Sequence, residues 1–140
     1  MQRVIFRNNI VRHTAGGVNI LSSDNVSPSQ LTNHITVTNN LFDDLTSATW
    51  GATKAFQIGG DAAFASDSPT GADSVTIDHN TIITTQTAIF YLYGRTAAVL
   101  PPRVTRQLTN LTITNNISLH NSLGLFGDRQ EAGCAGRIVA

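Results

Sequence analysis

A six-residue segment that occurs four times constrains this chain more than any other feature of its sequence. Each copy has apolar residues at its first and third positions and ends in Asn-Asn or His-Asn. The four copies occupy residues 4–9, 35–40, 75–80 and 111–116. Alternation with a period of two predicts a short strand with one buried face. The closing pair predicts a turn, because Asn tolerates the left-handed backbone conformation and bonds to nearby backbone groups.

A second apolar segment follows each copy. Val18, Ile89 and Leu125 lie nine residues after the last Asn of their copies, whereas Phe56 lies sixteen residues after its Asn. The longer spacing predicts an insertion at about residues 46–53. Proline cannot donate a hydrogen bond to a sheet, and it is absent from all of these segments, as expected for strands.

A strand, an Asn turn, a second strand and a loop, repeated four times, predict a solenoid. Equivalent strands then stack in parallel about 4.8 Å apart. The predicted fold class is all-β, a parallel β-helix of about four coils with a ladder of Asn9, Asn40, Asn80 and Asn116. Such a ladder satisfies its buried amides by bonding to the coils above and below. A β-sandwich is disfavoured because no Asn-Gly or Asp-Gly hairpin turn occurs, and a leucine-rich repeat needs a shorter period.

The pattern apolar-x-apolar-x-Asn-Asn, with an apolar pair about nine residues later, resembles the right-handed parallel β-helix repeats of the pectate-lyase-like family. The resemblance covers nearly the whole chain. It implies a right-handed helix, and it favours a polysaccharide partner because most enzymes of this fold act on acidic polysaccharides. It does not specify an activity, because the fold carries lyases, hydrolases, epimerases and non-catalytic adhesins alike.

We expect residues 1–140 to form a single parallel β-helix domain. Neither end has the sequence of a cap, since the first strand already contains Val4 and no long amphipathic helix is predicted. Uncapped end coils expose apolar core and strand edges. We therefore expect an excerpt of a longer β-helix, with self-association through the coil ends as the alternative. An extracellular or periplasmic location is expected if the parent protein carries a signal.

Composition argues against several other classes of function. Nine basic residues balance nine acidic residues, and only 13% of the chain is charged, which argues against nucleic acid as a partner. No apolar run approaches the roughly 18 residues of a membrane span. The single Cys134 rules out an internal disulfide, and no acidic cluster beyond Asp43 and Asp44 is present to bind calcium. We therefore predict no cofactor and no metal site.

The densest ionisable cluster follows the Asn corner. Equivalent positions of successive coils form columns, which places Arg12 beside Asp43 and His13 beside Asp44. The same two columns continue through four further residues: Ile83, Thr84, Leu119 and His120. Paired carboxyls beside His and Arg suit acid–base work on a glycosidic bond, so Arg12, His13, Asp43 and Asp44 are the candidate catalytic residues. The alternative is a surface ladder of ion pairs worth about 0–1 kcal/mol each.

Candidate residues for substrate binding lie on strands and loops of the predicted helix. They are Asp78, Trp50, Tyr93 and Arg95. Aromatic rings beside an Arg suit stacking on sugar faces and pairing with uronate carboxylates. The alternative for Tyr93 is a place in the core, because side chains along a strand alternate between the core and solvent. The stretch 59–74, rich in Ala, Ser and Gly, is predicted to be a loop that contains Asp73.

Two hypotheses of different class follow from the sequence. The first is a carbohydrate-associated β-helix module that resembles polysaccharide lyases and glycoside hydrolases. The Asn-Thr-Asp, Gly-His-Gly and Arg-Ile-Lys motifs of polygalacturonase-like enzymes are absent, so catalysis within this segment is left open. The second hypothesis is a non-catalytic β-helix that serves as a structural or adhesin-like stalk.

Overall fold

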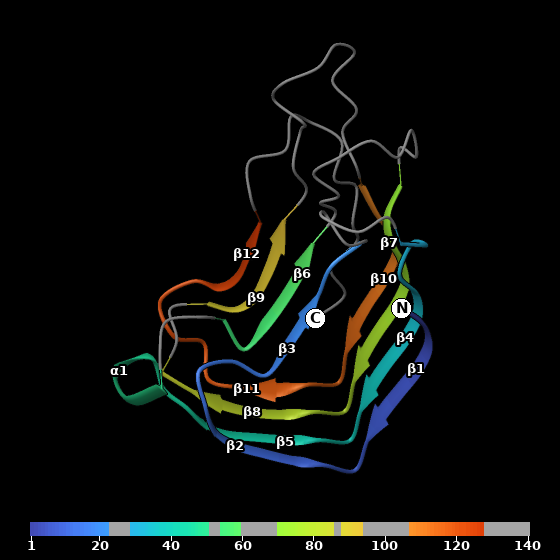
Figure 1. Cartoon of the computed structure of the whole chain (residues 1–140). Helices are drawn as coiled ribbons and strands as arrows, with labels where there is room; N and C mark the ends of the chain where they lie inside the picture. Colours follow the sequence, from blue (N-terminus) through green and yellow to red (C-terminus); the bar gives the residue numbers. More distant parts are fainter. Residues whose placement is uncertain (23–28, 51–53, 60–69, 86–87, 94–106, 128–140) are drawn as a thin grey trace.

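In the computed structural model, the described residues form three parallel β-sheets of four strands each (Figure 1). The described residues are 1–22, 29–50, 54–59, 70–85, 88–93 and 107–127. The first sheet consists of β1 (Gln2–Arg7), β4 (Asn33–Thr38), β7 (Thr70–Asp78) and β10 (Gln107–Thr114). The second consists of β2 (Ile10–Thr14), β5 (Leu41–Leu45), β8 (Thr81–Thr84) and β11 (Ile117–Ser118). The third consists of β3 (Val18–Ile20), β6 (Phe56–Gly59), β9 (Ala88–Tyr93) and β12 (Gly124–Gly127).

The strand order shows that each repeat is one coil of a parallel β-helix. Neighbours in the first sheet follow the order β1, β4, β7, β10, and the other two sheets have the corresponding order. The chain therefore passes through the first, second and third sheets and returns to the first, one strand further along (Figure 1). We call these passes coils 1 to 4. The predicted all-β parallel helix of about four coils is confirmed.

The pairing register of the first sheet follows the repeat alignment. Val4 pairs with Ile35, Ile35 with Val75, and Val75 with Leu111. These apolar side chains therefore form one inward column, as the alternation with a period of two predicts.

In the third sheet the alignment is wrong by one residue. Phe90, rather than Ile89, pairs with both Phe56 and Leu125. The register shifts between Gly124 and Leu125, where β9 has one more residue than β12. Ile89 and Leu125 lie at the same distance from their Asn residues but do not pair, because a β-bulge in β9 takes up one extra residue.

The hydrophobic core lies inside the coils and contains a stack of aromatic rings. The ring centroids of Phe42 and Phe56 are 5.0 Å apart, and those of Phe56 and Phe90 are 5.1 Å apart. Phe42 and Phe56 are fully buried. Glycine is needed at Gly17, because a Cβ there would lie 2.7 Å from the Ala55 carbonyl oxygen and 2.8 Å from the Phe42 ring.

Residues in the left-handed conformation, with φ between 52° and 60°, bend the coils, and ten of the eleven non-glycine cases are spaced five residues apart within their coil. The eleventh, Asn121 in coil 4, lies six residues after Asn115. The first bend consists of Arg3, His34, Ser74 and Asn110. The second bend consists of Asn8, Asn39, His79 and Asn115. The third bend consists of His13 and Asp44. Eight of these ten residues are Asn, Asp or His, the types that adopt this conformation most readily after glycine, so the sequence suits the geometry.

The predicted Asn ladder follows the second bend. The backbone N–H and Nδ2 of Asn40 donate to Oδ1 of Asn80 at 3.0 and 2.9 Å. The same two bonds join Asn9 to Asn40 and Asn80 to Asn116. Nδ2 of Asn80 also donates to the carbonyl oxygens of Val37 and Asp78. Asn40 and Asn80 are 3% and 1% exposed, so these bonds replace the water that their amides lose.

Candidate functional site

The third bend places consecutive polar side chains on the outside of the helix. In β5, Phe42 and Leu45 are fully buried, and Asp43 and Asp44 lie between them. A regular strand would point one of these two carboxylates inward. The left-handed conformation of Asp44, with φ of 53°, interrupts the alternation, so both side chains reach solvent.

Coil 1 has the same arrangement, and its two side chains pair with those of coil 2. Nη2 of Arg12 lies 2.8 Å from Oδ2 of Asp43. Nδ1 of His13 lies 2.7 Å from Oδ2 of Asp44. The structure therefore brings together the four residues that the repeat alignment placed side by side. More than half of the Arg12 and His13 side chains is exposed, so the pairs form a surface cluster.

Trp50 joins this cluster through the insertion of coil 2. The short helix α1 (Ser47–Trp50), the only helix in the described part of the chain, follows β5 directly. Its turn is closed by the backbone N–H of Trp50, which donates to the Thr46 carbonyl oxygen at 3.0 Å. The indole then packs edge-on against His13, with ring centroids 5.8 Å apart, and 44% of Trp50 stays exposed.

The contact between Trp50 and His13 was not predicted. The sequence contained a signal for it, because the insertion starts two residues after Asp44, which pairs with His13. We call His13, Asp44 and Trp50, with the neighbouring pair Arg12 and Asp43, the third-bend cluster.

The cluster ends at coil 3, where the predicted columns are wrong. The register of β5 and β8 shifts between Phe42 and Leu45, so that Thr84 pairs with Leu45 and not with Asp44. Thr84 is 2% exposed, and its hydroxyl donates to the Leu45 carbonyl oxygen at 2.7 Å. β8 lacks the extra residue that produces the third bend, so this coil contributes no polar pair to the cluster.

Asp78, predicted to bind substrate, lies at the second bend and is bonded within the protein. His79 Nδ1 lies 2.6 Å from one oxygen of its carboxylate, and Thr114 and Asn115 donate to the other at 2.8 and 2.9 Å. The hydrogen bond from His79, followed by those from Thr114 and Asn115, lowers the pKa of Asp78 to about 2. These partners all come from the second bend of coils 3 and 4, so Asp78 belongs to that bend and not to the third-bend cluster.

Asp73 repeats this arrangement at the first bend. It accepts hydrogen bonds from Thr109, Asn110 and Ser74 at 2.6, 2.8 and 2.9 Å. These bonds, led by that from Thr109, lower its pKa. The prediction that Asp73 lies in a loop is wrong, because it belongs to β7. The missed signal is a spacing of five residues, which separates Asp73 from Asp78 and Thr109-Asn110 from Thr114-Asn115.

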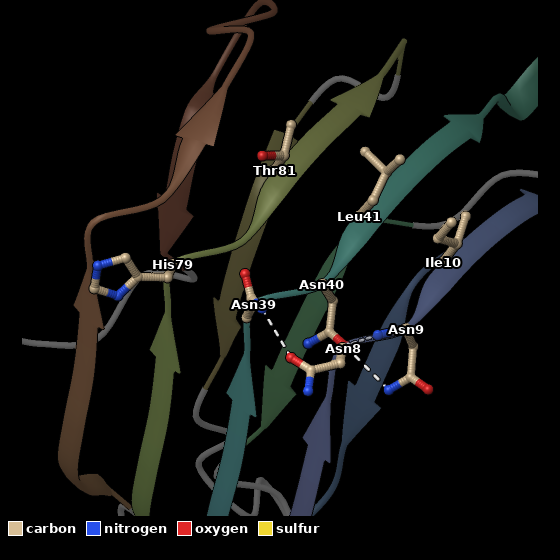
Figure 2. A pocket seen from close by; sticks show the side chains of 8 residues that line it. All are labelled: Asn8, Asn9, Ile10, Asn39, Asn40, Leu41, His79 and Thr81. Atoms are coloured by element: carbon tan, nitrogen blue, oxygen red, sulfur yellow. Dashed lines mark hydrogen bonds between the residues drawn. The ribbon is translucent and has the colours of Figure 1, made fainter.

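An open groove of about 380 Å³ lies along the second bend. Figure 2 shows the side chains that line it. The groove is lined by Asn8, Asn9, Ile10, Asn39, Asn40, Leu41, His79 and Thr81. Its amides bond to one another between coils; Nδ2 of Asn39, for example, donates to Oδ1 of Asn8 at 2.8 Å. His79 points away from Asn39 in this view. Because these amides already hold the coils together, the groove is a weaker candidate for a ligand site than the third-bend cluster.

A second hollow, of about 260 Å³, follows the third bend along the chain. It is lined by Gly16, Gly17, Val18, Asn19, Lys54 and Gln57. These residues come from the segments that follow His13 in coil 1 and Trp50 in coil 2. None of the lining residues belongs to the third-bend cluster.

The structure describes no side chain for two of the predicted binding residues, Arg95 and Tyr93. Arg95 lies outside the described residues. Tyr93 is the last residue of β9, and its side chain is not among those described.

The described residues contain no group of three His, Cys, Asp or Glu side chains arranged to hold a metal ion. None of the helices in the same residues is long and apolar enough to cross a membrane. Comparisons with family models, with curated proteins and with solved structures find no match for this chain.

Proposed function

We propose that this chain is a carbohydrate-binding β-helix module that contacts an uncharged polysaccharide at the third bend. The observation that carries the proposal is the exposed indole of Trp50 against His13, which Asp44 holds from the next coil. An indole offers a broad apolar face and a polar edge, which suits a sugar ring with apolar faces and hydroxyl groups at its rim. The resemblance of the repeat to pectate-lyase-like proteins supports carbohydrate as the ligand class.

The charges of the cluster favour an uncharged sugar over a uronate. Recognition of a uronate carboxylate needs a cationic group that is free to pair with it, most often a bidentate guanidinium. Arg12 is paired with Asp43, and His13 is bonded to Asp44. The cluster thus offers hydroxyl-binding oxygens and nitrogens around an aromatic ring, without an excess of positive charge.

Binding fits this cluster better than catalysis. Glycosidases place two carboxyl groups on opposite sides of the scissile bond, about 5 to 9.5 Å apart. Asp43 and Asp44 are instead neighbours on one strand, and each bonds to a side chain of coil 1. This arrangement supports a firm polar rim beside Trp50.

Affinity electrophoresis followed by titration calorimetry tests the proposal. The panel contains uncharged polysaccharides, such as xyloglucan, galactomannan and mixed-linkage glucan, and the acidic polymers polygalacturonate and alginate. The chain should bind at least one uncharged polymer. Trp50→Ala should weaken this binding about tenfold, which corresponds to about 1.4 kcal/mol.

Leu21→Ala is the matched control, because Leu21 is exposed to the same 44% and lies after β3, outside the cluster. It should bind like the unchanged chain. Equal losses in Trp50→Ala and Leu21→Ala, or no binding to any polymer, would contradict the proposal and leave a structural stalk as the better account.

Turnover is measured on the same panel by release of reducing ends and by absorbance at 235 nm. We expect none. Turnover that disappears in both Asp43→Ala and Asp44→Ala would replace the binding proposal with an enzymatic one.

A further inference from the structure

The Asn ladder has a direction that runs through the whole stack. In every step the backbone N–H and Nδ2 of one Asn donate to Oδ1 of the Asn in the next coil, from Asn9 to Asn40, Asn80 and Asn116. The two ends of the ladder therefore differ in chemistry. Coil 1 presents an acceptor, Oδ1 of Asn9, and coil 4 presents donors, the N–H and Nδ2 of Asn116.

The side-chain bonds at the two ends agree with this direction. Asn80 donates from Nδ2 to two carbonyl oxygens and to Oδ1 of Asn116. Asn116 donates to the two equivalent carbonyl oxygens, those of Ile77 and Thr114. Within the described residues, the third bond of Asn116 and a donor to Oδ1 of Asn9 are both missing.

The backbone hydrogen bonds that follow each ladder Asn run in the opposite direction, from each coil to the preceding one. The N–H of Leu41 donates to the Asn9 carbonyl oxygen at 2.9 Å, and that of Ile117 donates to the Asn80 carbonyl oxygen at 2.8 Å. By this rule the N–H of Ile10 in coil 1 and the carbonyl oxygen of Asn116 in coil 4 point out of the stack at opposite ends. Among the described residues, each end of the stack thus carries the groups that the other end needs.

The apolar side chains at the two ends are also only partly covered. Val4 and Phe6 in coil 1, and Leu111 and Ile113 in coil 4, pack against the core but remain partly exposed. Their counterparts in the inner coils, such as Val37 and Ile77, are 1% and 0% exposed. Covering the end coils would remove further apolar surface from water.

We propose that copies of this chain associate end to end, with coil 4 of one copy paired in parallel with coil 1 of the next. Asn116 donates to Oδ1 of Asn9 in the next copy, and the N–H of Ile10 in that copy donates to the Asn116 carbonyl oxygen. The two surfaces differ, so the contact does not close on itself and each copy leaves a new open end. Association therefore gives linear oligomers of increasing length and not a closed dimer.

Sedimentation velocity and multi-angle light scattering over a hundredfold range of concentration test the proposal. The mass should rise with concentration in steps of one 15.0 kDa chain. A constant monomer mass, or a dimer that does not grow, would overturn the proposal.

A pair of charge variants tests the register of the contact. In the proposed stack Thr112 of coil 4 lies beside Ile5 of the next copy, as it lies beside Thr76 within the chain. Both side chains are exposed, and within one chain they are three coils apart, on the order of 14 Å. Charges placed at these two positions therefore meet mainly at the contact between copies.

Ile5→Lys with Thr112→Lys should weaken association at least tenfold, because like charges directly opposite on parallel strands repel. Ile5→Lys with Thr112→Glu should restore it, and added salt should reduce the difference. Circular dichroism confirms that both variants keep the strand content of the unchanged chain. Equal association of the two variants would overturn the proposed register.

Discussion

The second and third bends of the helix have the same backbone conformation but opposite distributions of side chains. At the second bend, the residue that follows the left-handed position is Asn in all four coils, and in coils 2 and 3 it is buried. At the third bend, the outward-facing residues change from Arg12 and His13 in coil 1 to the half-buried Asp43 and Asp44 in coil 2, and coil 3 has no third bend. One bend thus repeats a single interaction, and the other collects different groups.

The difference separates a structural column from a recognition surface. A side chain that bonds to its own kind above and below must be the same in every coil, because any substitution leaves buried donors and acceptors unpaired. An exposed column has no such requirement and is free to vary from one coil to the next. A rigid scaffold commonly carries its functional residues at such positions. The predictions below test this division, beginning with the largest expected effect.

Asn80→Ala should lower the free energy of unfolding by about 3 kcal/mol, because the Asn40 N–H and the Val37 and Asp78 carbonyl oxygens lose their side-chain partner. Urea unfolding followed by circular dichroism measures the loss. Asn39→Gly is the control, since Asn39 is exposed and glycine keeps its left-handed conformation. Losses of equal size in the two variants would remove the distinction between the ladder and the rest of the bend.

Gly17→Ala should cost about 1–3 kcal/mol, because the new methyl group would collide with the Ala55 carbonyl oxygen and with the ring of Phe42. Gly124→Ala should cost less, about 1 kcal/mol, since its Cβ meets His120 only at 3.4 Å and the cost comes from φ of +57°. Thermal unfolding of both variants gives the comparison. A neutral Gly17→Ala would contradict the close approach of coils 1 and 2 beside the third bend.

Acid should destabilise the second bend through Asp78. Its pKa falls from 3.8 to about 2 on folding, so the ionised carboxylate favours the folded state. The contribution is fully present above pH 3.8 and is lost as the pH falls toward 2. The free energy of unfolding, measured by urea at pH 2 to 5, should fall less steeply in Asp78→Asn.

His79→Asn refines this test, because the hydrogen bond from His79 is the largest cause of the lowered pKa, and Asn occupies the same position in the other three coils. This variant should fold normally and show an intermediate slope between pH 4 and 2. A slope equal to that of the unchanged chain would assign the shift to Thr114 and Asn115 instead.

Asp44→Asn should have the smallest effect on stability, at most about 1 kcal/mol, because the pair with His13 is exposed. Asn also keeps the left-handed conformation of the bend. If the third-bend cluster binds sugar, the affinity should still fall a few-fold, since His13 loses the group that holds it against Trp50. Calorimetry with the uncharged polymer measures this loss. A large loss of stability without a change in affinity would contradict the assignment of the third bend to recognition and would make it a structural feature.

The fold was predictable because stacking in parallel makes equivalent residues neighbours. The four Asn-containing segments determined the columns of the first sheet and the ladder. Counting three and four residues beyond the Asn placed Arg12 beside Asp43 and His13 beside Asp44. Over such short distances, no bulge intervenes between coils 1 and 2.

Counting residues from the Asn failed where one strand has one residue more than the strand it pairs with. Nothing in the sequence shows that coil 3 omits the third bend, so Thr84 was aligned with Asp44 although it pairs with Leu45. The contact of Trp50 with His13 depends on the turn of α1, which a four-residue helix does not reveal through periodicity. Tertiary packing decides both, and spacing along the chain does not.

Nuclear magnetic resonance titration of the labelled chain with the uncharged polymer tests the division of the two bends most directly. Side-chain signals of Trp50 and of the ladder residues Asn40 and Asn80 are followed in one experiment. The indole N–H of Trp50 should shift and saturate, while the two buried amides stay in place. Shifts of the Asn40 and Asn80 amides with an unmoved Trp50 signal would contradict the account.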